Sequence, residues 1–198
     1  MASKGDLTKE RILSEAALLF QKKGFGATSI NNLLSATGIK KGSLYFHFPG
    51  KEEIGLAVLE RDKERSIRFM NSNLVGATPE ECLTHYFAAV YRKHEKSKFI
   101  GGCLFGNTAL EMSDSNESYT RFVERMFAEW IARLEEVITA AQEAGQVRDD
   151  LEANMLAHHV VSTIEGGIML ARLKKDGRPL SLCLDSLKKL FSCETKTC

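Results

Sequence analysis

The sequence lacks several features that would place it in a membrane or outside the cell. It contains no stretch of about 18 apolar residues, the length that a membrane-spanning helix needs. Its first residues lead directly into an amphipathic segment and include no hydrophobic core of a signal peptide. From these absences we expect a protein of the cytoplasm that does not enter a membrane.

Cysteine is sparse, and its placement argues against the usual cysteine-based sites. The chain has five cysteines, an odd number, and no CxxC pair. We therefore expect neither a disulfide framework nor a zinc site, and we predict no metal and no cofactor. The adjacent His158 and His159 face apart on a helix and make a poor metal pair. The cysteines are Cys82, Cys103, Cys183, Cys193 and Cys198.

Proline is also rare, with three residues in 198, and long runs of β-branched residues are absent. Ala, Leu, Glu, Lys and Arg dominate instead, which favours helices. Apolar residues at helical spacing, together with capping residues, predict an all-α fold of about nine helices. The predicted helices cover approximately residues 8–23, 30–37, 41–46, 51–73, 79 to the break at 101–102, 103–112, 117–144, 151–175 and 179–191.

The net charge is +1, but the charges are unevenly distributed. Residues 1–51 contain eight Lys or Arg against three Asp or Glu, whereas residues 52–198 contain nineteen against twenty-three. A basic first segment on a mildly acidic remainder is typical of a protein whose first segment meets phosphate.

The most informative segment lies in this basic part, at residues 7–54. The pattern predicts two short helices on a tight turn, and a further helix that opens at Lys51. The second short helix begins with the polar run Lys40–Ser43. The early residues of a recognition helix approach base edges, where lysine can donate to guanine and glycine lets the backbone come close. Taken alone, the two lysines would instead be read as a solvated helix face.

A set of residues in this segment has the order and spacing of a family signature. On these residues the chain resembles the DNA-binding domain of the tetracycline-repressor (TetR/AcrR) family of bacterial transcriptional regulators. Lys40 departs from the pattern, because Ser or Thr usually caps the third helix there. The matching residues are Gly24-Phe25, Ala27-Thr28-Ser29, Leu33, Gly38-Ile39, Lys41-Gly42-Ser43-Leu44-Tyr45, His47-Phe48 and Lys51-Glu52-Glu53.

The resemblance implies the organisation of the whole chain. Family members are all-α homodimers that bind double-stranded DNA at a palindromic operator. We accordingly expect a helix-turn-helix DNA-binding domain at residues 1–52 and a helical ligand-binding and dimerisation domain at residues 53–198. The effector is a small molecule that neither the resemblance nor the residues identify.

Contacts with DNA are predicted from the family pattern and from the position of residues at the start of the recognition helix. Tyr45 or His47 alone would more often be a residue at the edge of the core. Phe46 and Phe48 are predicted to be core residues, because Leu44 and Phe48 share a helix face. The predicted DNA-binding residues are Thr28, Ser29, Lys40, Lys41, Gly42, Ser43, Tyr45, His47 and Lys51.

An effector pocket is expected in the second domain because of the resemblance. Aromatic side chains with a few polar groups suit such a pocket, but a stripe at helical spacing is more often core. Cys103 begins a predicted helix, where the dipole favours a thiolate, so it is either a reactive sensor or a small buried residue. The candidates are Tyr86, Phe87, Tyr91, Cys103, Phe105, Asn107, Glu111, Trp130, His159 and Thr163.

The last two predicted helices carry small and apolar residues that suit a dimer seam. The predicted interface residues are Gly166, Gly167, Leu170, Leu184 and Leu187. The alternative is a seam within one chain, because apolar spacing looks the same in both cases.

Three functions are consistent with these patterns to different degrees. The main interpretation is a ligand-responsive DNA-binding regulator, a repressor that an effector releases from its operator. The alternatives are a DNA-bound structural protein without ligand control and an all-α enzyme. For an enzyme we find no nucleophile–base pair at local spacing, no phosphate-binding glycine loop and no HExxH motif.

Overall fold

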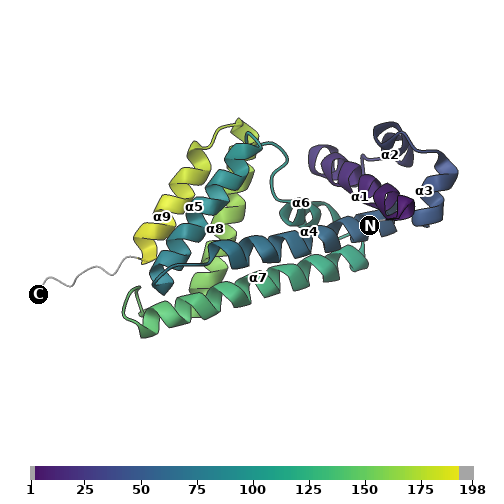
Figure 1. Cartoon of the computed structure of the whole chain (residues 1–198). Helices are drawn as coiled ribbons and strands as arrows, with labels where there is room; N and C mark the ends of the chain where they lie inside the picture. The colour runs from purple at the N-terminus through teal and green to yellow at the C-terminus, as the bar shows by residue number, and fades with distance from the viewer. Residues whose placement is uncertain (1–2, 192–198) are drawn as a thin grey trace, which may run out of the picture. The chain divides into compact units, whose positions relative to one another are not determined.

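A computed structural model describes residues 3–191 and confirms the predicted all-α class, since these residues form helices and connecting turns without a strand (Figure 1). Cys193 and Cys198 lie outside the described residues. The helices are α1 (Lys4–Lys23), α2 (Ile30–Thr37), α3 (Lys41–His47), α4 (Lys51–Asn73), α5 (Pro79–Lys96), α6 (Leu104–Met112), α7 (Glu117–Glu143), α8 (Ala153–Lys174) and α9 (Arg178–Phe191).

Packing divides the chain into two compact units. The first unit contains the segment that ends at Arg65 together with Cys103–Glu124. The second unit contains Ser66–Gly102 and the segment that begins at Arg125. Helix α6 therefore packs in the same unit as α1, α2 and α3, although it lies far along the chain. The domain boundary after residue 52 remains a prediction.

Helix α1 begins four residues before the predicted start at Thr8. Ser3 caps it, because its hydroxyl accepts the Asp6 amide at 3.1 Å while the Asp6 carboxylate accepts the Ser3 amide at 2.9 Å. The inward face of α1 consists of Ile12, Leu13, Ala16, Ala17 and Phe20. The predicted start was wrong because the capping signal precedes the apolar stripe by more than a turn.

The short helices α2 and α3 are defined by their ends. Ser29 caps α2 in a reciprocal pair with Asn32, and Gly38 ends α2 in the left-handed region at φ 64°. Lys40 precedes α3 without a side-chain hydrogen bond to the helix, as its departure from the family pattern predicts. Leu33 of α2 and Leu44 of α3 are fully buried and join the two helices to the core of the first unit.

In the second unit, α9 packs against α8 and α5 (Figure 1). Gly167 makes the α8–α9 approach possible, because a methyl group there would lie 3.0 Å from Leu180 Cδ1 and 3.1 Å from Cys183 Cβ. His94 is buried in the last turn of α5. Burial, and secondarily the nearby Lys93 ammonium, lower the pKa of its imidazole to about 4.

Candidate DNA-binding surface and effector region

Helix α3 turns most of its side chains to solvent. Leu44 is buried, and so is Phe48, which directly follows the helix. Lys40, Lys41, Gly42 and Tyr45 are exposed, while Ser43 and His47 are half-buried. The Lys41 ammonium lies 5.8 Å from the centre of the Tyr45 ring. The predicted recognition residues therefore form one open polar and aromatic surface that can meet a partner.

Phe46 belongs to this exposed surface, and its predicted place in the core was wrong. Its side chain is 85% exposed, whereas Phe48 is buried as predicted. The reason is helical geometry: a residue two positions from Leu44 lies on nearly the opposite side of the helix. The same helical spacing that assigns Leu44 and Phe48 to the core therefore indicates that Phe46 is exposed.

Two of the predicted DNA-binding residues, Thr28 and Ser29, have hydrogen-bonding roles within the fold. Thr28 is fully buried, and its hydroxyl donates to the Gly24 carbonyl at 2.7 Å. Its side chain is therefore unavailable to phosphate in this conformation, which corrects that prediction. Ser29 is exposed, but its hydroxyl accepts the Asn32 amide at 3.1 Å as the cap of α2.

Lys51, the first residue of α4, holds the turn between α1 and α2. Residues 24–28 are called the α1–α2 turn below. The Lys51 ammonium donates to the Phe25 carbonyl at 2.9 Å and lies 4.4 Å from the centre of the Phe25 ring. A second donor of the ammonium is directed at the Gly26 carbonyl, 3.5 Å away. Contact of Lys51 with phosphate remains a prediction.

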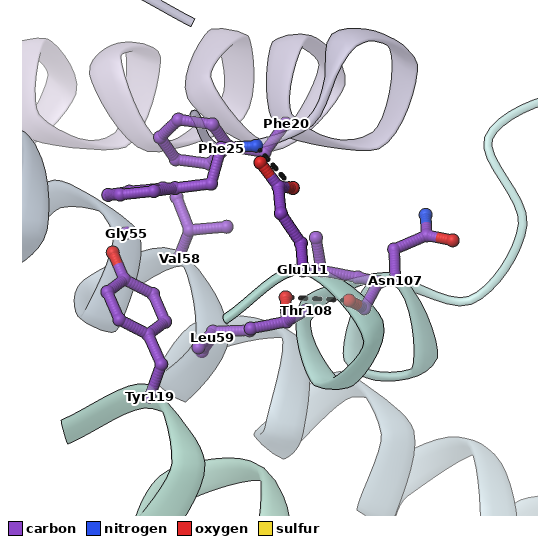
Figure 2. A pocket seen from close by; sticks show the side chains of 10 residues that line it. Phe20, Phe25, Gly55, Val58, Leu59, Asn107, Thr108, Glu111 and Tyr119 are labelled. Carbon is purple, nitrogen blue, oxygen red and sulfur yellow. Dashed lines mark hydrogen bonds between the residues drawn. The ribbon is translucent and has the colours of Figure 1, made fainter. Parts of the chain in front are cut away.

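Glu111 contacts the same turn from α6. Figure 2 shows its carboxylate pointing at the turn backbone, where it accepts the amides of Phe25 at 2.8 Å and Gly26 at 2.6 Å. Two amides on one carboxylate are charge-assisted hydrogen bonds, the stronger class. Glu111, predicted as an effector contact, is therefore already engaged within the chain.

A small cavity lies beside this contact, inside the first unit. Its volume is about 10 Å³, close to the least space that admits one water molecule. An effector larger than water therefore needs the side chains around the cavity to move. The lining residues are Phe20, Phe25, Gly55, Val58, Leu59, Leu104, Asn107, Thr108, Glu111 and Tyr119 (Figure 2).

Tyr119 forms the other wall of this cavity and was not predicted. It is buried against Phe25, with ring centres 4.8 Å apart, and its hydroxyl donates to the Glu52 carbonyl at 3.1 Å. Burial, and secondarily the nearby carboxylates of Glu52 and others, raise the pKa of this phenol well above its usual range. Gly55, a glycine inside helix α4, was the available signal, because such a glycine often marks a close approach.

The predicted effector residues are divided between the two units. Cys103, Phe105, Asn107 and Glu111 belong to the first unit, and Asn107 and Glu111 share its cavity. The other six belong to the second unit. There the Trp130 indole donates to the buried Tyr86 hydroxyl at 2.6 Å, and Tyr91 packs on Phe99 at 5.8 Å. Phe87 lies in the core near Phe191, with ring centres 6.3 Å apart.

Two polar residues of the predicted effector set, His159 and Cys103, contact neighbouring residues of the helix that each belongs to or caps. His159 is exposed and lies 3.4 Å from the Thr163 hydroxyl on the same helix. Cys103 is half-buried and caps α6, since the Gly106 amide donates to its sulfur at 3.5 Å. Whether Cys103 senses electrophiles remains a prediction, and so does the effector pocket as a whole.

The predicted dimer residues divide into buried and accessible groups. Leu184 and Leu187 lie in the chain's own core, and Gly167 is occupied by the α8–α9 contact. These three cannot offer area to a partner without unfolding that contact, which corrects their assignment. Leu170 is exposed, and a methyl group added at Gly166 would meet nothing within 4 Å.

Residues 3–191 contain no helix that is both long and apolar enough to cross a membrane. Over the same range, no three His, Cys, Asp or Glu side chains come together as a metal site would require.

Two protein-family models match this chain, one in its N-terminal part and one in its C-terminal part. "Bacterial regulatory proteins, tetR family" matches residues 12–58, and "Tetracyclin repressor-like, C-terminal domain" matches residues 79–187. The first match covers α2 and α3 and most of the basic segment described above. The second covers α5 to α8 and most of α9.

Individual relatives agree with these matches over nearly their whole length. The HTH-type transcriptional regulator YxaF of Bacillus subtilis is 32% identical over 192 residues, which cover 96% of this chain and 97% of that protein. The HTH-type transcriptional repressor DhaR of a Mycobacterium species is 27% identical over 174 residues, 87% of this chain and 86% of that protein. A TetR transcriptional regulator from Chloroflexus aurantiacus has a crystal structure with a TM-score of 0.86, 29% identity and 94% coverage of both chains. The chain belongs to the TetR family and is a helix-turn-helix transcriptional regulator.

Proposed function

We propose that this regulator is a repressor that binds an inverted-repeat operator as a homodimer and leaves it when a small-molecule effector binds. The observation that carries the proposal is the open face of α3, where Lys40, Lys41 and Tyr45 are exposed around the glycine at position 42. A basic recognition helix of this kind reads base edges in the major groove.

The exposed residues of α3 have distinct proposed roles. Lys41 and Ser43, at the start of the helix, donate to base edges, and Gly42 lets the backbone approach. Tyr45, His47, Ser29 and Lys40 contact phosphates and set the register. Phe46 offers an apolar surface of the kind that contacts a thymine methyl group. Lys51, at the start of α4, contributes charge beside the α1–α2 turn.

The function is tested by binding of fluorescent duplexes that the protein selects from a random library. We expect an inverted repeat, bound at least about 10³-fold more tightly than a scrambled duplex. Because lysines displace counterions from the backbone, the affinity should fall steeply and linearly on logarithmic axes as salt rises. Equal affinity for selected and scrambled duplexes would contradict a specific regulator and would favour a DNA-bound structural protein.

A dimer surface is supported by an exposed stripe along α8. Residues at intervals of three or four along this helix face solvent and are mostly apolar. They are Met155, His159, Ser162, Met169 and Leu173, with Leu170 beside them. Gly166 lies in the same stripe and leaves open space. An apolar stripe on a helix is stable in water when a second copy covers it, and two copies present two recognition helices to an inverted repeat.

Replacing Leu173 by glutamate should convert the dimer to a monomer at micromolar concentration. Leu173 is 77% exposed, so the change spares the core of the chain but places an unpaired charge in the proposed interface. Sedimentation velocity is the measurement. Leu110→Glu is the matched control, because Leu110 is 83% exposed on α6, and that variant should stay dimeric. If Leu173→Glu sediments like the unmodified dimer, the interface lies elsewhere.

An effector would act by favouring a dimer geometry that the operator does not accept. Such a ligand needs different affinities for the two geometries, since equal affinities shift nothing. The residues proposed to contact it are Tyr86, Tyr91, Trp130 and Thr163 of the second unit, which combine aromatic surface with a polar group.

A further inference from the structure

We infer that Glu111 is a positioning residue for DNA binding: its carboxylate holds the α1–α2 turn in the conformation that the operator requires. The inference rests on the proposed function, because it assumes that the first unit binds DNA. It gives Glu111 a different role from the effector contact that its sequence position suggested.

The turn is shaped to receive this carboxylate. Besides accepting the two amides, the Glu111 carboxylate fills the space beside the two glycines of the turn. A methyl group at Gly24 would lie 2.8 Å from Glu111 Oε2, and one at Gly26 would lie 3.1 Å from Oε1. Gly24 also has φ 87°, a conformation that other residues rarely adopt. The two glycines therefore permit the backbone conformation of the turn and leave free the space that the carboxylate occupies.

An opposite charge holds the same peptide group from its other end. The Gly26 amide and the Phe25 carbonyl belong to one peptide bond. Glu111 accepts from the amide, while the Lys51 ammonium donates to the carbonyl at 2.9 Å and lies 3.5 Å from the Gly26 carbonyl. A peptide between an anion and a cation is polarised by both, so each hydrogen bond strengthens the other. Glu111 and Lys51 therefore act on the turn as a pair.

The α1–α2 turn also determines where α2 begins. The Thr28 amide donates to the Phe25 carbonyl at 3.2 Å, and the Thr28 hydroxyl donates to the Gly24 carbonyl. Ser29 follows directly as the cap of α2. A turn that leaves this position moves the start of α2, and with it the exposed Ser29. The position of α6 therefore controls the start of the helix-turn-helix through Glu111.

The direction in which DNA affinity changes when Glu111 is replaced distinguishes a positioning role from simple repulsion between the carboxylate and phosphate. Removing a carboxylate from a DNA-binding unit normally tightens binding, because it removes repulsion from phosphate. A positioning role predicts the opposite sign. If each turn keeps its position only about a third of the time without the carboxylate, both turns of the dimer are in position about a tenth of the time, and the apparent affinity falls about tenfold.

The experiment compares Glu111→Gln with Glu117→Gln on the selected operator by fluorescence anisotropy. Glu117 is an exposed residue of the first unit, pairs with Arg121 on its own helix and does not touch the turn. We expect about tenfold weaker binding for Glu111→Gln at every operator variant, with an unchanged order of base preference, and unchanged or slightly tighter binding for Glu117→Gln. Unchanged or tighter binding for Glu111→Gln would overturn the inference.

Hydrogen exchange supplies a readout that does not depend on DNA. The amides of Phe25 and Gly26 should exchange faster in Glu111→Gln than in the unmodified chain, and at the unmodified rate in Glu117→Gln. Equal protection in all three proteins would also overturn the inference. Thermal unfolding checks that both variants are folded. If the unmodified protein binds no specific DNA, the proposed function fails instead, which the earlier selection experiment detects independently.

Discussion

Replacing Lys41 by alanine should weaken binding of the dimer to its operator by about 2 to 6 kcal/mol, because two subunits each lose a base contact worth about 1 to 3 kcal/mol. Lys41 is exposed at the start of α3, so the change removes no packing from the chain. The loss should also be selective. Discrimination among bases should relax at one symmetric pair of operator positions and persist elsewhere. Anisotropy titrations with single-substitution operators measure both effects.

Lys22→Ala is the matched control for this experiment. Lys22 is an exposed lysine in the last turn of α1, and its removal lowers the charge of the same unit by the same amount. It should weaken all duplexes slightly and equally, because loss of charge acts through phosphate. If Lys41→Ala also weakened every operator variant equally, Lys41 would be a phosphate contact and base recognition would rest on other residues of α3.

Replacing Gly55 by alanine should lower the free energy of unfolding by about 2 to 3 kcal/mol. A methyl group at this position in α4 would fall on the Tyr119 hydroxyl oxygen and lie 2.8 Å from Phe25 Cε2. The gain in helix propensity on replacing glycine by alanine, about 1 kcal/mol, is too small to offset this overlap. Tyr119 is buried and hydrogen-bonded to the Glu52 carbonyl, so it cannot move aside freely. Urea denaturation measures the change.

A double-mutant cycle identifies the cause. Tyr119→Phe removes the hydroxyl that the methyl group would meet, so the cost of Gly55→Ala should be smaller in the Tyr119→Phe background. Gly42→Ala is the control, because it is the same substitution in a helix, α3, with nothing within 4 Å, and it should be neutral or stabilising in the absence of DNA. Equal effects at Gly55 and Gly42 would show that helix propensity, rather than the overlap, decides the result.

The elements of this fold were largely predictable because their signals are local. The Thr78–Pro79 start of α5 and the left-handed Gly38 after α2 depend on a few neighbouring residues. The helix-turn-helix was predictable for the same reason, since its signature is contiguous. The start of α1 was missed because its capping pair, Ser3 and Asp6, precedes the apolar stripe.

Contacts between distant segments were not predictable from spacing. Apolar periodicity assigns Leu187 and Leu170 alike to the seam of the last two helices, but only packing shows that Leu187 lies in the chain's own core and that Leu170 is exposed on its surface. Glu111 meets Phe25 across a separation of 86 residues, and nothing local to either residue indicates the other. Burial of Thr28 likewise depends on the turn that Glu111 and Lys51 hold.

Protonation of the buried His94 makes the stability of the fold depend on pH. Because its pKa is about 4 in the folded chain and near 6.5 when unfolded, the unfolded chain binds one more proton between these values. The contribution of a neutral His94 to stability is therefore complete above pH 6.5 and is lost progressively as the pH falls towards 4. Acidification consequently acts on the second unit through a group that lies outside the proposed DNA-binding surface, and folding of this regulator is coupled to the acidity of its surroundings.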